Sequence, residues 1–183
     1  TEKLLTEVNT SVKMFDAIET LNGTINIVFE DDTKVSLSKY SKLVVDEYVY
    51  DSNKNVGKVS LKGRLGTLRY TSGKIAKNNR KNVKITSPTA SVSVRGTDFT
   101  MTVEATGKTT FQLLPSIDAN GNSYTGSIAV SNSSGVVVLN QAFEVTRVEN
   151  NLKPPSAPKK EARQAPQEDK PKVKEDQREK NTN

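Results

Sequence analysis

Apolar and polar side chains alternate with a period of two through most of the chain, which predicts β-strands. Within 24–30, Ile25, Ile27 and Phe29 share one face, and Val35 and Leu37 resume that face after a turn at 31–33. Clusters of Gly, Asn, Asp and Ser interrupt the alternation at short intervals, as turns between short strands do. Further strands are predicted at 42–50, 58–61, 65–71, 83–86, 91–94, 98–105, 109–114, 127–131 and 136–148.

Many short strands separated by regular turns predict an all-β fold: an antiparallel sandwich or roll, or a solenoid-like stack. We expect hairpins around Gly63, around Gly107 and around 132–135, and a loop at 118–126. The first eighteen residues, with Leu4, Leu5 and Val8, fit either a helix or a first strand.

The composition changes at residue 152. Five of the seven prolines follow it, and no aromatic residue does. Such a segment cannot bury enough apolar surface to offset the entropy lost on ordering. The sequence therefore predicts an N-terminal segment at 1–19, a β domain at 20–152 and an extended Pro/Lys/Glu-rich C-terminal arm at 153–183. We expect this arm to be ordered only against a partner; the alternative is plain disorder.

The chain has no histidine and no cysteine, so the usual general base, the usual metal ligands and any disulfide are missing. We therefore expect no enzyme activity and no cofactor. No apolar run reaches the roughly 18 residues of a membrane span. The net charge is +6, but acidic side chains are interleaved with the basic ones, which argues against nucleic acid as a partner.

The segment 86–103 has the most distinctive pattern: a strand, an Arg-Gly-Thr break and a second strand. Gly96 allows a bend that a larger residue would resist, and Arg95 and Asp98 flank it, so we expect these two to pair across it. The predicted role is architectural, fixing a corner of the sheet. The motif residues are Pro88, Val94, Arg95, Gly96, Thr97, Asp98 and Phe99.

The motif SPTASVSVRGTDF, at 87–99, resembles the signature of the FecR-type domain, an all-β module. Ser87 between Thr86 and Pro88 is a small departure from that signature. The hairpin at 25–45 is also similar to the family, and the resemblance covers about residues 20–115. Classical FecR-type regulators relay iron-siderophore uptake to a sigma factor. By this resemblance, the classical regulators have an N-terminal cytoplasmic helical segment, a membrane span and a further small domain after the FecR part. We expect none of these three parts in this chain.

The segments 41–51, 65–83 and 137–149, with VRGTDF, are similar to stand-alone FecR-like proteins of tailed phages, notably marine ones. This resemblance implies a structural virion protein of the tail or baseplate, located in the virion. Its partners would be neighbouring virion proteins, and possibly itself, bound through the β body and the arm. The alternative is a bacterial periplasmic or secreted FecR-type module for ligand sensing or signalling.

The densest basic run of the body lies at 74–81, in a segment predicted to be a loop. Its side chains either contact a partner or remain solvated. The predicted partner contacts, from this run and from the start of the arm, are Lys77, Arg80, Lys81, Lys153, Pro154 and Pro155.

Two acidic motifs do not predict sites. In 118–129, Ser123 and Ala129 occupy the sixth and twelfth positions, where a calcium loop needs Gly and Glu, so a hairpin turn is favoured. Asp31 and Asp32 are predicted to be solvated turn residues rather than a catalytic pair.

Overall fold

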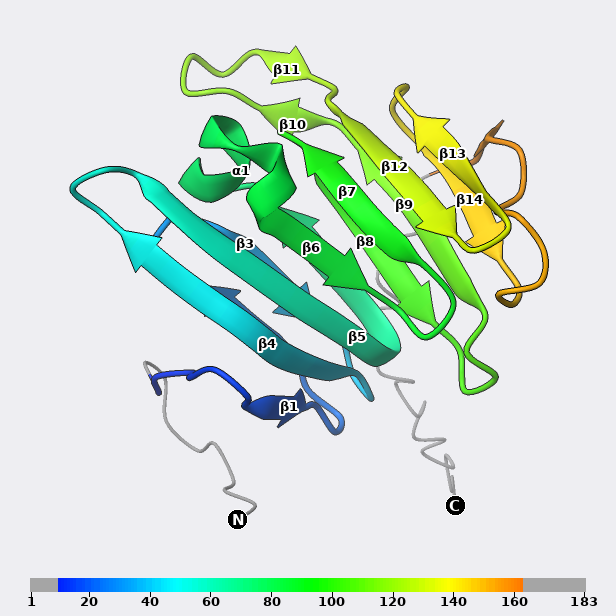
Figure 1. Cartoon of the computed structure of the whole chain (residues 1–183), viewed down its shortest axis with the longest axis horizontal. Coiled ribbons are helices and arrows are strands. Elements are labelled where there is room, and N and C mark those ends of the chain that lie inside the picture. The colour runs from blue at the N-terminus through cyan, green and yellow to red at the C-terminus, as the bar shows by residue number, and fades with distance from the viewer. Residues whose placement is uncertain (1–9, 163–183) are drawn as a thin grey trace, which may run out of the picture.

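A computed structural model describes residues 10–162 of the 183-residue chain, and the fold is nearly all β, as predicted. A large mixed sheet curls so that its two halves face each other across the core (Figure 1). The strands are β1 (Ala17–Glu19), β2 (Ile25–Val28), β3 (Lys34–Leu37), β4 (Lys42–Asp51), β5 (Val56–Thr71), β6 (Val83–Thr86), β7 (Ser91–Arg95), β8 (Asp98–Val103), β9 (Thr109–Leu114), β10 (Ser116–Ile117), β11 (Ser123–Tyr124), β12 (Ser127–Asn132), β13 (Gly135–Leu139), β14 (Glu144–Val148) and β15 (Lys159–Lys160).

Strand β5 belongs to both halves. Its first part pairs with β4 and β6, and its last residues pair with β3 and β8. At the junction Gly66 has a φ of +77°, and an added Cβ would collide with Ser41 and the backbone of Tyr40, so glycine lets the strand pass from one half to the other.

The hairpin predicted around Gly63 is wrong, because β5 is continuous through that position. Gly63 lies opposite Leu43 in the ladder, and an added Cβ there would collide with the side chain of Met101. Glycine is therefore required at this position by the packing of the core and not by a turn.

The front half in Figure 1 has the order β1-β4-β5-β6-β7-β12-β13, and the back half has β2-β3-β5-β8-β9-β14-β15. Strands β5 and β6 are parallel, so the chain must return between them. It does so through α1 (Lys74–Asn78) and the 3-10 turn η1 (Arg80–Asn82). The basic run is therefore helical, not the predicted loop, and it docks by burying Ile75 and Ala76.

One apolar cluster fills the space between the halves. Tyr70 of β5 and Phe99 of β8 are fully buried, with ring centroids 5.4 Å apart. These residues come from the alternating faces seen in the sequence, because residues two apart in a strand share one side of a sheet.

The C-terminal strands differ from the prediction in pairing. β12 and β13 form the expected hairpin, but 136–148 is not one strand. The chain turns at 140–143, where Phe143 has a φ of +66°, and β14 crosses to the back half to pair with β9. The predicted loop at 118–126 contains β11, which pairs with β10.

Residues 153–162, which we call the strap, lie against the body. β15 pairs with β14, and the Arg147 guanidinium holds both carboxylate oxygens of Glu161 at 2.8 and 2.7 Å. The prediction that the arm is ordered only by a partner is therefore wrong for the strap, because the edge of β14 supplies backbone partners; 163–183 lie outside the described residues.

At the other end of the chain, Leu4, Leu5 and Val8 also lie outside the described residues. Residues 10–16 form no helix, and β1 pairs with β4. Among the residues that the structure describes, no helix has the length and apolar character needed to cross a membrane.

Candidate functional site

An open hollow of about 520 Å³ lies where α1 and η1 meet the β7–β8 turn and β11. Its basic side chains are Lys77, Arg80 and Arg95, and Tyr124 adds an aromatic ring. We call this site the basic hollow. Figure 1 shows α1 and the β10–β11 hairpin at the same end of the molecule. Two segments that the sequence singled out separately, the basic run and the Arg-Gly turn, thus line one site.

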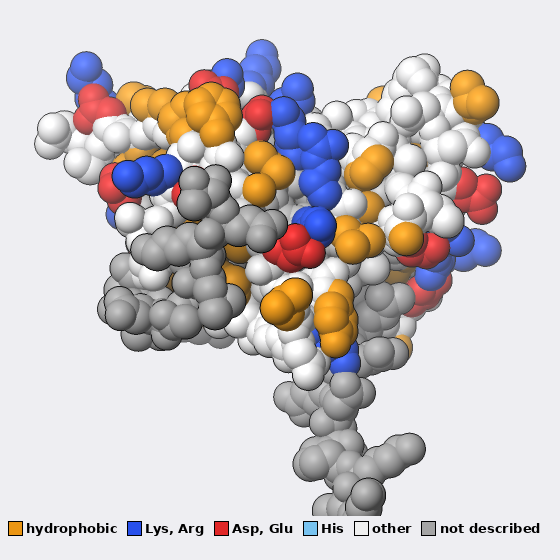
Figure 2. Space-filling model, turned by 90° about the horizontal axis from the view of Figure 1, so that it is seen from below, with side chains coloured by type: hydrophobic (Ala, Val, Ile, Leu, Met, Phe, Trp, Pro, Cys, Tyr) orange, Lys and Arg blue, Asp and Glu red, His pale blue; other side chains and the backbone are white. Residues whose placement is uncertain are grey.

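Within residues 10–162, the cations of the basic hollow, Lys77, Arg80 and Arg95, form no ion pair. No Asp or Glu in that range lines the hollow. Some cations elsewhere form ion pairs, as Lys58 Nζ does with the Glu47 carboxylate at 2.7 Å, and others, such as Arg64, form none within residues 10–162. The basic hollow differs in gathering three such cations around one concave surface. The face of the molecule in Figure 2 has both signs of charge interspersed with apolar side chains. Unpaired cations around a concave surface favour an anionic partner.

Asp31 positions α1 beside the hollow. It is fully buried, and its carboxylate accepts hydrogen bonds from the Ile75 N–H at 3.2 Å and from the Thr33 hydroxyl at 2.8 Å. Its backbone carbonyl accepts from the Lys74 N–H at 2.7 Å. The prediction of a solvated Asp31 is wrong, because the β2–β3 turn is covered by α1; Asp32 is exposed as predicted.

Tyr48 completes the surroundings of Asp31. Its hydroxyl donates to the Asp31 carboxylate at 3.3 Å and accepts from the Asp31 N–H at 3.1 Å. Burial raises the pKa of Tyr48 to about 12, so this hydroxyl stays protonated at neutral pH. The ring of Tyr48 also contacts Phe29, with centroids 4.7 Å apart.

The Arg-Gly-Thr turn joins β7 of the front half to β8 of the back half. Gly96 has a φ of +51°, and no atom lies within 4 Å of an added Cβ. The next residue, Thr97, is fully buried: its N–H donates to the Ser72 hydroxyl at 3.0 Å, and its carbonyl accepts from that hydroxyl at 2.9 Å. The turn therefore holds Arg95 at the rim of the hollow from a fixed base.

The predicted pair between Arg95 and Asp98 is wrong. Asp98 is buried and its carboxylate contacts the guanidinium of Arg69 on β5 at 2.8 Å. Asp98 lies opposite Thr71 in the β5–β8 ladder, which brings it close to Arg69, whereas Arg95 ends β7 and faces the hollow. Val94 and Phe99, on either side of the turn, are core residues.

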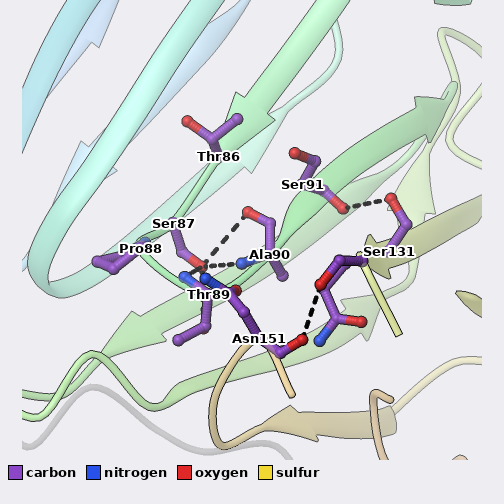
Figure 3. Close-up of a pocket in the computed structure, with 10 residues that line it drawn as sticks. Thr86, Ser87, Pro88, Thr89, Ala90, Ser91, Ser131 and Asn151 are labelled. Atoms are coloured by element: carbon purple, nitrogen blue, oxygen red, sulfur yellow. Dashed lines mark hydrogen bonds between the residues drawn. The ribbon is translucent and has the colours of Figure 1, made fainter. Parts of the chain in front are cut away.

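A second hollow, of about 310 Å³, lies at the opposite ends of β6 and β7. Pro88 of the motif lines it, with hydroxyls and amides of Ser87, Ser131 and Asn151 (Figure 3). Ser87 is engaged locally, because its Oγ accepts from the Ala90 N–H at 3.1 Å. No charged residue lines this site, which we call the neutral groove.

The remaining predicted contacts lie away from the basic hollow. Lys81 is exposed but does not line it. The carbonyl of Lys153 accepts from Asn132 beside the neutral groove at 2.7 Å. Pro154 lies close to Gly135, and Pro155 is buried. The structure therefore separates the basic run from the start of the arm.

Sequence reasoning missed two residues of the site, Asp31 and Tyr124. An Asp side chain in a turn often accepts a hydrogen bond from the backbone N–H two residues later. Asp31 does so, because its carboxylate accepts from the Thr33 N–H. That pattern alone does not reveal that α1 covers the turn. The hairpin turn favoured for the acidic motif in 118–129 is present at 118–122, where the Asp118 carboxylate accepts from the N–H groups of Asn120 and Asn122.

Comparisons with known proteins agree with this architecture. A protein family described as "FecR protein" matches residues 16–114. Two crystal structures of a "putative anti-sigma factor" from Parabacteroides distasonis ATCC 8503 share the fold, with TM-scores of 0.55 and 0.56 at 15% and 16% identity. Each similarity covers 80% of this chain, which spans 60% of the solved chain. Among curated proteins, none matches.

Proposed function

Since the chain belongs to the FecR family, we propose that it is a non-enzymatic recognition module that binds an acidic surface of a partner protein through the basic hollow. In this proposal the module works in a bacterial signalling system, in the periplasm or as a secreted protein. The binding would neutralise three cations that have no acidic partner within residues 10–162.

The observation that carries the proposal is the convergence of Lys77, Arg80 and Arg95 from two separate segments. One segment is anchored by the buried Asp31, and the other by the contact between Ser72 and Thr97. Because both segments are already anchored, binding need not order their backbone, although the long side chains still lose rotamer freedom. Complementary charge can then contribute to orientation and specificity.

Two further facts favour recognition in signalling. Two solved chains of this fold carry the description of an anti-sigma factor, a regulator rather than an enzyme. The sequence also has no histidine and no cysteine, so the commonest general base that activates a serine, and the thiol nucleophile, are both missing.

Virion assembly is the second candidate function. The strap favours it, since it adds a strand to the edge of β14 and so provides an example of the contacts that extended arms make in assemblies. Neither of the two solved structures above is described as a virion protein. The placement in a phage tail or baseplate stays a prediction.

The test is capture of partners from the native source with the tagged full chain. A triple variant, Lys77→Glu, Arg80→Glu and Arg95→Glu, reverses the charge of the basic hollow. The matched control, Lys13→Glu, Lys34→Glu and Arg64→Glu, makes the same change in net charge at exposed positions outside the hollow. Bound proteins are identified by mass spectrometry.

We expect the hollow variant to lose a partner that the wild type and the control both retain, and the retained binding to weaken as salt is raised. A sigma regulator or outer-membrane receptor among the partners supports signalling, whereas tail or baseplate proteins support assembly. Equal capture of the same partners by both triple variants would contradict the proposal that the basic hollow binds them.

A further inference from the structure

Strand β13 forms an open end of the front half. Within residues 10–162 it pairs only with β12. The edge of β14 in the back half, by contrast, is covered by the strap. An uncovered strand edge presents backbone donors and acceptors that can pair with another strand.

The register shows which residues face this open edge. A two-residue turn, Ser133 and Ser134, joins β12 to β13, and Val136 and Val138 lie opposite Ser131 and Ala129. In a hairpin of this kind, alternate residues exchange hydrogen bonds with the neighbouring strand, beginning with the pair that closes the turn. Val136 and Val138 are the residues between, so their N–H and C=O groups point to the open edge.

The side chains of the same two residues are exposed on the outer face. Val136 is 63% exposed and Val138 is 52% exposed, while Leu139 is buried. The strand has no lysine and no proline, the features with which exposed edges usually avoid pairing. No charged residue occurs anywhere from 119 to 143, although the chain carries a net charge of +6.

We propose that β13 pairs with β13 of a second copy of this chain, antiparallel about a two-fold axis through Val137. In this register Val136 lies opposite Val138 of the second copy, and both have backbone groups that face the edge. The four exposed valines then lie together on one face, and the two front halves form one continuous sheet.

A second copy fits this edge because a two-fold contact places the same surface against itself. Near the axis a residue lies close to its own copy, so a charge there would repel itself, and the uncharged run from 119 to 143 avoids that repulsion. In this register the edge-facing N–H and C=O groups of Val136 lie opposite those of Val138 in the second copy. The two strands can therefore exchange hydrogen bonds.

The first measurement is sedimentation of the full chain from low micromolar to millimolar concentration. We expect a concentration-dependent dimer for the wild type and a monomer for Val138→Lys. Val49→Lys is the control, since Val49 is similarly exposed, at 55%, on β4 of the same half. A wild type that stays monomeric throughout, or a dimer unchanged by Val138→Lys, would overturn the proposal.

The second measurement tests the register without relying on a destabilising change. The chain has no native cysteine, so Val136→Cys and Val138→Cys each introduce a unique thiol. Residues opposite each other in a hydrogen-bonded pair have Cα atoms about 5.5 Å apart, within the range for a disulfide. Under mild oxidation, a mixture of the two variants should form covalent dimers more readily than either alone. Equal cross-linking of the separate variants would contradict this register.

Discussion

The basic hollow and the neutral groove lie at opposite ends of β6 and β7 but are built differently. The basic hollow has three cations that form no ion pair within residues 10–162, two of them on a helical crossover held by one buried carboxylate and the third at the end of β7. The neutral groove has only uncharged residues, and its hydroxyls are bonded within the protein, as Thr89 is to the neighbouring buried Thr109 at 3.0 Å. The difference teaches that hydroxyls of the groove bond one another, whereas the hollow leaves three cations without an ion pair inside residues 10–162, which is why we propose an anionic partner for it.

The two ends also depend on different numbers of anchoring residues. In the groove the hydroxyls of Ser87 and Thr89 bond each other and the buried hydroxyl of Thr109 beneath them, so no single residue holds the site together. At the hollow, one residue, Asp31, contacts the β2–β3 turn, Tyr48 on β4 and the start of α1. A single substitution should therefore damage the hollow more than the groove.

Replacing Asp31 with alanine should have the largest effect. It leaves the buried N–H of Ile75 and the hydroxyls of Thr33 and Tyr48 without their acceptor, which should cost about 2–4 kcal/mol of unfolding free energy. Urea unfolding measures this change. The neighbouring Asp32→Asn is the control, since Asp32 is exposed, forms within residues 10–162 an ion pair with Lys74, and has a φ of +68° that asparagine tolerates. Similar losses in both variants would contradict the central role of Asp31.

Replacing Arg69 with alanine should have an intermediate effect. The buried carboxylate of Asp98 loses its cation, which should cost about 1–3 kcal/mol, the range for a buried group left without its partner. Thermal or urea unfolding gives the change. Arg95→Ala should change stability little, since Arg95 is exposed and belongs to the surface that we propose binds an acidic partner. A larger loss of unfolding free energy in Arg95→Ala than in Arg69→Ala would instead support an ion pair between Arg95 and Asp98.

Acidification should have the smallest effect on stability. The effect should arise at the strap, which begins beside the neutral groove. The Arg147 guanidinium lowers the pKa of Glu161 below its ordinary value of 4.5. Because the folded pKa is lowered, the stabilisation is fully present above pH 4.5 and is lost as the pH falls through the lowered pKa. An NMR titration of the Glu161 carboxyl measures it, and Arg147→Met should restore the ordinary value. Titration of wild-type Glu161 at that value would show that the two groups do not interact in solution.

Local patterns predicted much of the strand content. The strands at 83–86 and 109–114 appear with the predicted bounds, because alternation and flanking turns are properties of neighbouring residues. The continuity of β5 could not be predicted in this way, since Gly63 is explained by Met101, far along the chain. The pairing of β14 with β9 is likewise a long-range choice.

The candidate site was predicted in pieces. Lys77, Arg80 and Arg95 were all singled out, but their convergence depends on the parallel pairing of β5 with β6, which no local pattern encodes. Asp31 was read as solvated because a turn is usually exposed, and its burial follows only from the docking of Ile75 and α1. The resemblance to the FecR family, by contrast, was visible in one continuous motif and is confirmed by the family match.

The passage of β5 from one half of the sheet to the other has a consequence for the refolding rate. Neither half can complete its ladder until this one strand is in place, so partial structures with only one half formed should be scarce at equilibrium. Its neighbours are distant in sequence, as in the pairing of Gly66 with Val103, and folds dominated by such contacts acquire their native structure slowly. A chain diluted from denaturant should therefore recover in one slow, concerted phase.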